Sequence, residues 1–253
     1  MTNSMKPVKQ APFSGFAGFG GGLGTLSSAA SGPTYVDDVF AINLYRNDAN
    51  SREFNNGLDM SGEGGLIITK YYDATTDWAW VDSERGVSKV LKSNSYTGEA
   101  TEAWIQSFDD DGFTHGSYIG TGDNYGVCSW SFRKAPGFFD VVKWTGNSTQ
   151  GRQIAHSLGS APGMILVKRL GSANWEVWHN SFGVNEYMAL NSSGQKYTSG
   201  GPWNGTAPTS THFTVSADSD VNLNGETYVA YLFAHDDQSF GTNGDEAIIK
   251  CGI

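Results

Sequence analysis

The strongest constraint on the fold is an internal repeat in the amino-acid sequence. Paired residues recur at a separation of 97, and the separation grows slowly to 101 toward the end of the chain. A tandem duplication followed by small loop insertions leaves such a steady drift, whereas chance similarity would scatter the separations. The sequence therefore predicts two copies of one module. The matched positions are Leu66 and Met164, Trp78 and Trp175, Val87 and Val184, Asn94 and Asn191, Trp104 and Trp203, Phe113 and Phe213, and Trp130 and Tyr231.

The composition favours β-strands within each module. The 253 residues include 33 glycines, 8 tryptophans, 11 tyrosines and 14 phenylalanines, while only 17% are charged. Such a balance is typical of short strands and turns rather than of long charged helices. We expect an all-β fold of two tandem duplicated antiparallel modules, each a β-sandwich or jelly-roll-like unit, after an extended glycine-rich N-terminal arm. Strands are predicted at Val39–Tyr45, Leu66–Lys70, Val127–Phe132, Phe138–Trp144, Met164–Val167, His212–Val215, Tyr228–Phe233 and Ala247–Cys251.

The repeat also sets the predicted boundaries. Residues 1–34 are the arm, residues 35–137 the first module and residues 138–253 the second. A late match pairs Val141-Val142-Lys143 with Ile248-Ile249-Lys250. Residues 247–251 are therefore expected to be the opening strand of a third copy that is otherwise absent. Such a strand has an unpaired edge unless it pairs with a module or with a neighbouring subunit.

Two local patterns refine the second module and the first. Asn224-Gly225 predicts a two-residue hairpin turn, because both residues tolerate a positive φ. The polar residues before it, Asp218, Asp220 and Asn222, alternate as on the solvent face of a strand that leads into that hairpin. Glu99–Ser107 is the strongest helix candidate and is expected to be short at most.

The N-terminal arm differs from the rest of the chain. Its 34 residues contain seven glycines, two lysines and no acidic residue, so the arm cannot bury enough apolar surface to fold alone. A secretory signal is the competing interpretation, but glycines interrupt the apolar stretch that it needs. Phe13, Phe16 and Phe19 are spaced by three and offer bulky anchors on a flexible backbone. We expect these three residues to dock the protein into an assembly.

The charge limits the classes of partner. Sixteen basic and twenty-six acidic residues give a net charge of -10, which disfavours a nucleic-acid duplex or an anionic membrane surface as the main partner. The longest apolar run, Tyr228–Ala234, has seven residues, far fewer than the roughly twenty of a spanning helix. Neither nucleic acid nor a membrane is an expected partner.

No pattern of reactive residues indicates catalysis. The five histidines show no metal-ligand spacing, and Cys128 and Cys251 are expected to be free, buried thiols. The sequence lacks a GxSxG elbow, a phosphate-binding loop and a dinucleotide fingerprint. Paired carboxylates of a glycan-cleaving enzyme need only meet in space, but a duplicated chain argues against one asymmetric cleft. We expect no enzyme activity, no cofactor and no metal site.

The tryptophans and the basic residues each have two interpretations. Recurrence at equivalent positions favours packing in the module cores, whereas exposed tryptophans would stack on sugar rings. Trp203, between glycines and polar residues, is the candidate glycan contact. Arg85 and Arg133-Lys134 are interpreted as surface or inter-subunit ion pairs rather than as a phosphate site.

Several longer stretches, from residue 33 to the end of the chain, resemble a domain of tail-fibre-like structural proteins in tailed bacteriophages, especially marine ones. The stretches are Tyr35–Phe40, Leu58–Leu66, Glu84–Val87, Phe108–Phe113, Trp130–Val142, Ile154–Gly159, Pro162–Ile165, Ala207–Ser210 and Thr227–Asp236.

The resemblance implies a non-enzymatic structural protein on the exterior of a virion, on its tail or its capsid. A tail-fibre or tail-appendage component anchored by the arm is the first expectation. A capsid decoration protein and a carbohydrate- or host-receptor-binding module are the alternatives. The implied partners are other virion proteins, further copies of the chain and host surface glycan. Virion parts are multiplied by symmetry, so we expect a homo-oligomer, with three copies in a fibre or capsid decoration.

Overall fold

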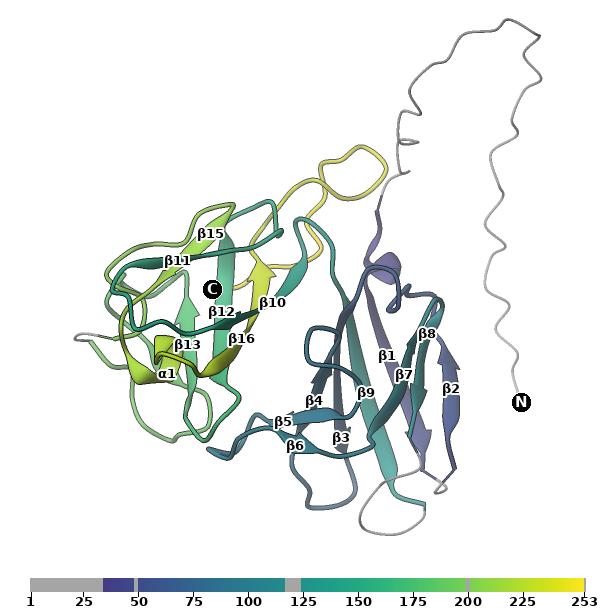
Figure 1. Ribbon diagram of the computed structural model, residues 1–253. Coiled ribbons are helices and arrows are strands. Elements are labelled where there is room, and N and C mark those ends of the chain that lie inside the picture. Colours follow the sequence, from purple (N-terminus) through teal and green to yellow (C-terminus); the bar gives the residue numbers. More distant parts are fainter. Residues whose placement is uncertain (1–33, 48–49, 117–123, 199–200, 253) are drawn as a thin grey trace, which may run out of the picture. The chain divides into compact units, whose positions relative to one another are not determined.

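Two antiparallel main sheets, each paired with a small sheet, make up the computed structural model (Figure 1). The structure describes residues 34–252 apart from 48–49, 117–123 and 199–200. We call the described residues up to 137 the first half and those from 138 the second half. No helix in the described ranges is long and apolar enough to cross a membrane.

The first half contains nine strands in two sheets. Its main sheet has the order β1-β9-β3-β4-β5-β6, and its small sheet has the order β2-β8-β7. A 3₁₀ turn, Val36–Asp38, precedes the first strand. The strands are β1 (Phe40–Arg46), β2 (Arg52–Asn55), β3 (Gly65–Tyr71), β4 (Ala79–Asp82), β5 (Lys89–Lys92), β6 (Ala100–Thr101), β7 (Ile105–Asp109), β8 (Gly112–His115) and β9 (Gly126–Arg133).

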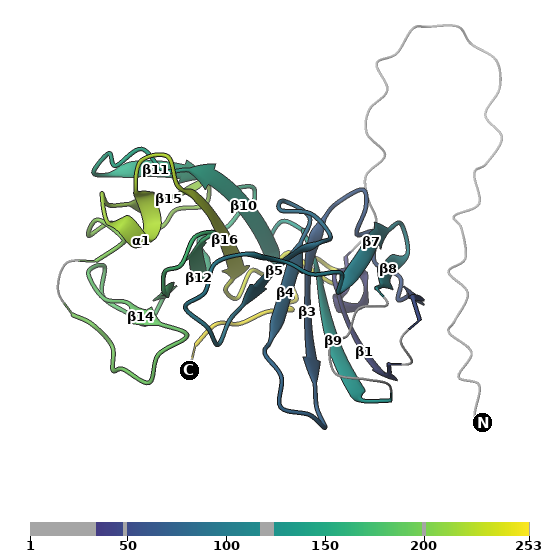
Figure 2. The same cartoon turned by 60° about the horizontal axis from the view of Figure 1, so that its bottom comes forward.

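The second half repeats this strand order. Its main sheet runs β10-β16-β12-β13-β14, and β11 pairs with β15 in the small sheet. One helical turn, α1 (Ser219–Asn222), lies between the last two strands in sequence and at the opposite end of the molecule from β1 (Figure 2). The strands are β10 (Phe139–Thr145), β11 (Arg152–Ala155), β12 (Pro162–Arg169), β13 (Trp175–His179), β14 (Met188–Ala189), β15 (His212–Val215) and β16 (Thr227–Ala234).

The strand register is equivalent in the two halves. Ile68 lies opposite Trp130 in the first main sheet, and Leu166 lies opposite Tyr231 in the second. These are the positions that the sequence repeat matches. The all-β sandwich architecture is confirmed, and both halves share strand order and register. Duplication of an ancestral module remains a prediction that this likeness supports.

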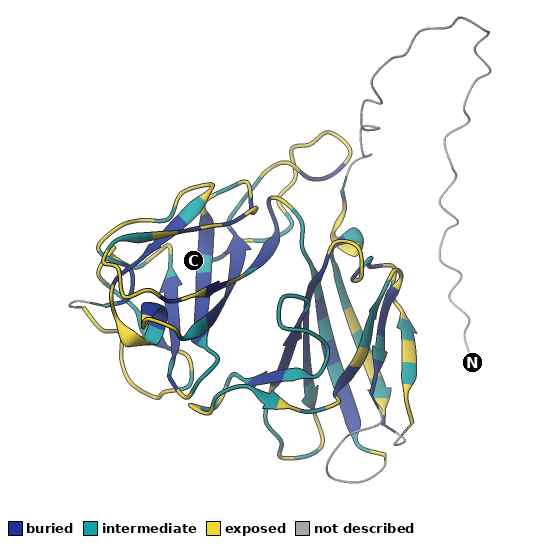
Figure 3. Ribbon diagram, viewed as in Figure 1, coloured by how far each residue is buried: buried dark blue, intermediate teal, exposed yellow. Residues whose placement is uncertain are grey.

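The buried residues form three clusters. Each half has one cluster between its main sheet and its small sheet, where alternate side chains of the two sheets meet. The third lies between the two main sheets and joins the halves. The described residues of both halves accordingly belong to one compact unit. Figure 3 shows the consequence for the second half, whose central strands are buried over most of their length.

Two predictions in the second half are wrong. Residues 247–251 form no strand; the Ile249 carbonyl instead accepts a hydrogen bond from the Asp236 amide, and the Cys251 amide donates to His235 Nδ1. The segment packs irregularly against the end of β16, so the short apolar match to β10 reflects burial and not a strand.

Asn224-Gly225 does form a turn, but it does not join two paired strands. β15 pairs with β11, whereas β16 pairs with β10 and β12. The polar residues before the turn build α1, with Asp218 as its N-cap. The Asn222 amide nitrogen donates to two backbone carbonyls, and the side chain is buried for that reason.

The helix candidate in the first half is also wrong. Glu99–Ser107 contributes to β6 and β7 instead of forming a helix. Tertiary pairing overrides a weak local preference here, since Ile105 pairs with His115 of β8.

Candidate functional site

The predicted anchor and glycan residues come first. Phe13, Phe16 and Phe19 lie outside the described residues. Trp203 is only 2% exposed and belongs to the core between the sheets of the second half. Its ring has no free face on which a sugar could stack, so the placement corrects the interpretation of Trp203 as a glycan contact. Its indole Nε1 has no hydrogen-bond partner among the described residues.

A polar hollow of about 420 Å³ lies beside Trp203 in the second half. Gln150, Asn185, Asn204, Ser216 and Asp218 line it. The fold already uses several of these groups: Gln150 Nε2 donates to Asn204 Oδ1, and Gln150 Oε1 accepts from the Ala217 amide at 3.0 Å. Amide and carboxylate groups that line an open hollow can recognise hydroxyl groups of a small polar ligand.

Charged side chains of Asp82, Arg85 and Glu99 lie in contact at the junction of the two halves. Arg85 follows β4 in a turn, and its side chain is fully buried together with that of Asp82. Arg85 Nε donates to Asp82 Oδ2 at 2.6 Å, and the Tyr231 hydroxyl of β16 donates to the same oxygen at 2.7 Å. The turn of the first half is thereby bonded to the central strand of the second half.

Every N–H group of the Arg85 guanidinium has a partner. Nη1 donates to the Lys89 carbonyl at 3.0 Å and to Glu99 Oε2 at 3.3 Å. Nη2 donates to the Trp80 carbonyl at 2.8 Å and to the Tyr231 hydroxyl at 3.2 Å. Burial raises the pKa of Tyr231 well above its usual range, so the phenol stays protonated. A guanidinium with all five donors in use has none left for a ligand, so Arg85 joins the halves.

The position of Arg85 corrects its assignment to the protein surface. A second bridge lies at the surface of the same junction: Lys134 Nζ contacts Glu84 Oε1 at 3.2 Å and Asp140 Oδ1 at 3.3 Å. Burial lowers the pKa of Lys134, but Asp140 and Glu84 outweigh this and raise it overall. Lys134 is therefore held as a cation between the two halves.

Aromatic rings complete the junction. Trp80 of β4 lies 5.3 Å from Trp175 and 5.1 Å from Tyr231, measured between ring centroids. The Trp175 Nε1 donates to the Lys92 carbonyl of the first half at 3.1 Å. Phe132 and Phe233, which are equivalent in the repeat, contact each other at 5.6 Å. The two main sheets therefore meet through aromatic rings, of which Phe132 and Phe233 are equivalent in the repeat whereas Trp80 and Trp175 are not.

The pKa values of other titratable groups are also shifted by burial. Within the described ranges no three His, Cys, Asp or Glu side chains are arranged to hold a metal ion. Burial raises the pKa of Glu176 to about 8, and nearby Asp220 and Asp218 act in the same direction. Burial also lowers the pKa of His115 to about 4. Cys128 and Cys251 are both free thiols, the first half-buried and the second buried.

Sequence reasoning missed Arg85 and Tyr231 as partners. The local signal is Asp82 three residues before Arg85, which lets the carboxylate accept from both the Arg85 amide and its guanidinium. Nothing local indicates Tyr231, which lies 146 residues further along the chain.

Comparison with known proteins agrees with the extent of this unit. No curated protein and no solved structure matches the chain. A family model, described as a domain of unknown function (DUF7483), matches residues 37–252, a range that spans both halves and the junction between them. The chain therefore belongs to the DUF7483 family.

Proposed function

We propose that this protein is a non-enzymatic structural component of a tailed-phage virion, a tail-fibre or tail-appendage part anchored by residues 1–34. In this role it stands on the outside of the particle and contacts other virion proteins and copies of itself. The two halves then act as one rigid body that the particle presents to solvent.

The observation that carries the proposal is where the phage-like stretches lie. Glu84–Val87 contains the buried Arg85, Trp130–Val142 spans the end of β9, the start of β10 and the connection between them, and Thr227–Asp236 contains Tyr231. All three meet at the junction of the halves. Three of the stretches that carry the resemblance thus supply residues that hold the two halves together, which supports a structural role.

Localisation in purified particles tests the proposal. Cryo-electron microscopy should place a few to a few tens of copies at the tail. Hundreds of copies on the shell would instead establish the alternative, a capsid decoration protein. Complete absence from purified particles would reject the virion role.

The arm has its own test. Replacement of Phe13, Phe16 and Phe19 by serine should leave the described unit folded but prevent incorporation into particles. Normal incorporation of this variant, with circular dichroism unchanged, would show that the anchor lies elsewhere.

The polar hollow beside Trp203 supports a second candidate function, binding of a host surface glycan. Asn185 lines this hollow and is exposed, and its side chain makes no hydrogen bond to another described residue, so its replacement tests the hollow without removing a structural bond. Glycan-array binding that Asn185→Ala weakens at least about tenfold would support this function. Binding that persists in Asn185→Ala, or no binding by the unchanged protein, would remove it.

A further inference from the structure

We propose that β1 is a self-association strand: two copies of this chain join edge to edge, antiparallel, across a two-fold axis at Asn43. The joined strands would make one continuous sheet of the two main sheets of the first halves. This pairing does not depend on a virion role, so its failure would leave the proposed function standing.

The backbone of β1 directs hydrogen-bonding groups away from the sheet. The Arg133 amide donates to the Val39 carbonyl at 2.8 Å, and the Asn47 amide donates to the Tyr125 carbonyl at 3.0 Å, at the two ends of the β1–β9 ladder. Bonded pairs alternate in an antiparallel ladder, so Ile42 and Leu44 direct their amides and carbonyls outward. Among residues 34–252 as described, none bonds these groups.

The equivalent edge in the second half is closed. Phe139 of β10 exchanges two backbone hydrogen bonds with Ala135, at 3.0 and 3.1 Å. The Val141 amide donates to Asp140 Oδ1 at 2.9 Å, and the Val141 carbonyl accepts from Lys134 Nζ at 3.4 Å. Proteins commonly block a sheet edge with charged side chains in this way. The same strand order thus has a blocked edge at β10 and an open edge at β1.

The side chains of the two edges differ in the same sense. Val141 is fully buried, whereas its equivalent Ile42 is 53% exposed. Lys143 stands where the first half has Leu44, and Leu44 is 70% exposed. Exposed aliphatic residues on an unblocked edge strand are a template for another strand.

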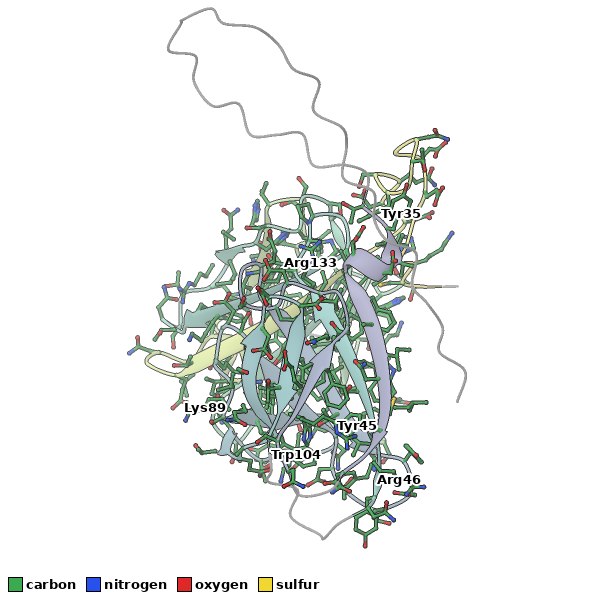
Figure 4. The ribbon with its side chains drawn as sticks, turned by 90° about the vertical axis from the view of Figure 1, so that its right-hand side faces the viewer. Tyr35, Tyr45, Arg46, Lys89, Trp104 and Arg133 are labelled. Atoms are coloured by element: carbon green, nitrogen blue, oxygen red, sulfur yellow. The ribbon has the colours of Figure 1, made fainter. Side chains whose placement is uncertain are left out.

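A second copy of β1 fits this template better than an unrelated strand. With the axis at Asn43, Ile42 of one copy lies opposite Leu44 of the other, and both such pairs exchange backbone hydrogen bonds. The same register brings the acidic start of one strand, Asp37 and Asp38, toward the basic end of its partner, Arg46 and Arg52. Figure 4 shows β1 running from the end near Tyr35 and Arg133 to the end at Tyr45 and Arg46.

The pairing has a defined stoichiometry. An isologous contact uses the same patch on both copies and therefore closes at two. It follows that β1 contacts yield a dimer, which is compatible with larger assemblies only if these form through other surfaces.

The experiment is a concentration series of the full chain by sedimentation velocity, joined to hydrogen–deuterium exchange. We expect a species of twice 27.2 kDa at high concentration. The Ile42 and Leu44 amides should become protected as that species forms, whereas the Val141 amide should be equally protected at every concentration. Leu44→Lys places on β1 the charged residue that β10 has at the equivalent position, Lys143, and should raise the dimer dissociation constant at least about tenfold. Leu190→Lys, at a residue that is 45% exposed, is the matched control and should leave it unchanged.

Three results would overturn the proposal. A chain that stays monomeric throughout, a dimer that Leu44→Lys leaves intact, or a dimer that forms with no added protection at Ile42 and Leu44 would each place the contact elsewhere or exclude it. The exchange measurement uses the unchanged chain and so decides even where a variant fails to fold. Protection of β1 only by another virion protein would assign the edge to that partner instead.

Discussion

Trp78 and Trp175 occupy equivalent positions in the two halves, yet Trp78 is 38% exposed and Trp175 is fully buried. The local hydrogen bond is the same in both halves. The Trp78 amide donates to Asn94 Oδ1, and the Trp175 amide donates to Asn191 Oδ1. The shared register therefore sets the backbone but not the surroundings of the side chain. The two rings differ in their contacts: Trp175 packs against Trp80 of the other half, whereas Trp78 stacks on Trp130 of its own half.

The ionic contacts across the joint are not matched at equivalent positions of the two halves. The turn with Arg85 reaches from the first half to Tyr231 in the second. Its equivalent in the second half has Phe182, whose ring packs against His179 of its own half. Two halves with one strand order thus make an asymmetric joint, which covers β10 and leaves β1 open.

The largest test of this comparison replaces each tryptophan of the equivalent pair by alanine. Trp175→Ala should lower the free energy of unfolding by about 4 kcal/mol, because a buried ring and its contacts with Trp80 and Tyr231 are lost. Trp78→Ala should lower it by about 1 kcal/mol, because the ring is partly in water and, among the described residues, stacks on Trp130 alone. Denaturant titrations give both values, and equal losses would contradict the asymmetry of the joint.

The next test breaks the ionic part of the joint. Arg85→Met should lower the free energy of unfolding by about 3 kcal/mol, because the Asp82 carboxylate stays buried without its cation. Arg46→Met is the matched control, since the Arg46–Asp73 pair is comparably short but 54% and 32% exposed. Its loss should be below about 1 kcal/mol. A smaller effect at Arg85 than at Arg46 would show that the buried bridge does not hold the halves together.

These tests bear on what the sequence could predict. Long apolar runs predicted the bounds of β3, β10, β12 and β16 to within two residues, because a strand buried on both faces needs apolar side chains throughout. The sequence did not predict the remaining strands, which are β2, β4, β5, β6, β7, β8, β11, β13 and β14. Two of these, β2 and β11, have four residues each and mix polar with apolar side chains over a length too short to separate from a loop.

The joint was harder to predict than the strands. A charged residue in a turn indicates the surface on average, and Arg85 is an exception because Asp82, Glu99 and Tyr231 converge on it in space. The prediction of Trp203 as a glycan contact was wrong for a similar reason. Its polar neighbours line the hollow while the ring itself turns into the core. Both outcomes depend on contacts between segments distant in the sequence.

A third prediction uses pH to distinguish the second half from the first. Glu176 of β13 has Ala79 as its equivalent, so only the second half buries a carboxyl here. Its pKa is raised from 4.5 to about 8, and the folded state therefore keeps a proton that the unfolded chain loses. Stability should fall as pH rises from about 4.5 to about 8, by at most about 1.4 kcal/mol per pH unit.

Glu176→Gln should remove this fall in stability. The free energy of unfolding of the variant should therefore rise relative to that of the unchanged protein as pH increases from about 4.5 to about 8. Thermal or urea unfolding at several pH values measures the difference. Glu186→Gln is the control. A hydrogen bond from Lys196 holds the pKa of Glu186 below its usual value, so the stability of this variant should not increase relative to the unchanged protein as pH rises. A constant difference between Glu176→Gln and the unchanged protein would mean that Glu176 ionises normally.

The smallest expected effect tests the likeness of the halves instead of their difference. Asn94→Ala and Asn191→Ala each remove one bond to a tryptophan amide and one to the preceding residue, Asp77 or Asn174. Both should lower the free energy of unfolding by about 1 kcal/mol, because the local bonds are the same. Asn94→Ala should also let the pKa of Asp77 rise toward its usual value, since the Asn94 amide is the main cause of its lowering. Unfolding titrations and carboxyl NMR titration measure the two effects. Unequal losses would show that the neighbours supplied by the other half reach even this local hydrogen-bonded turn.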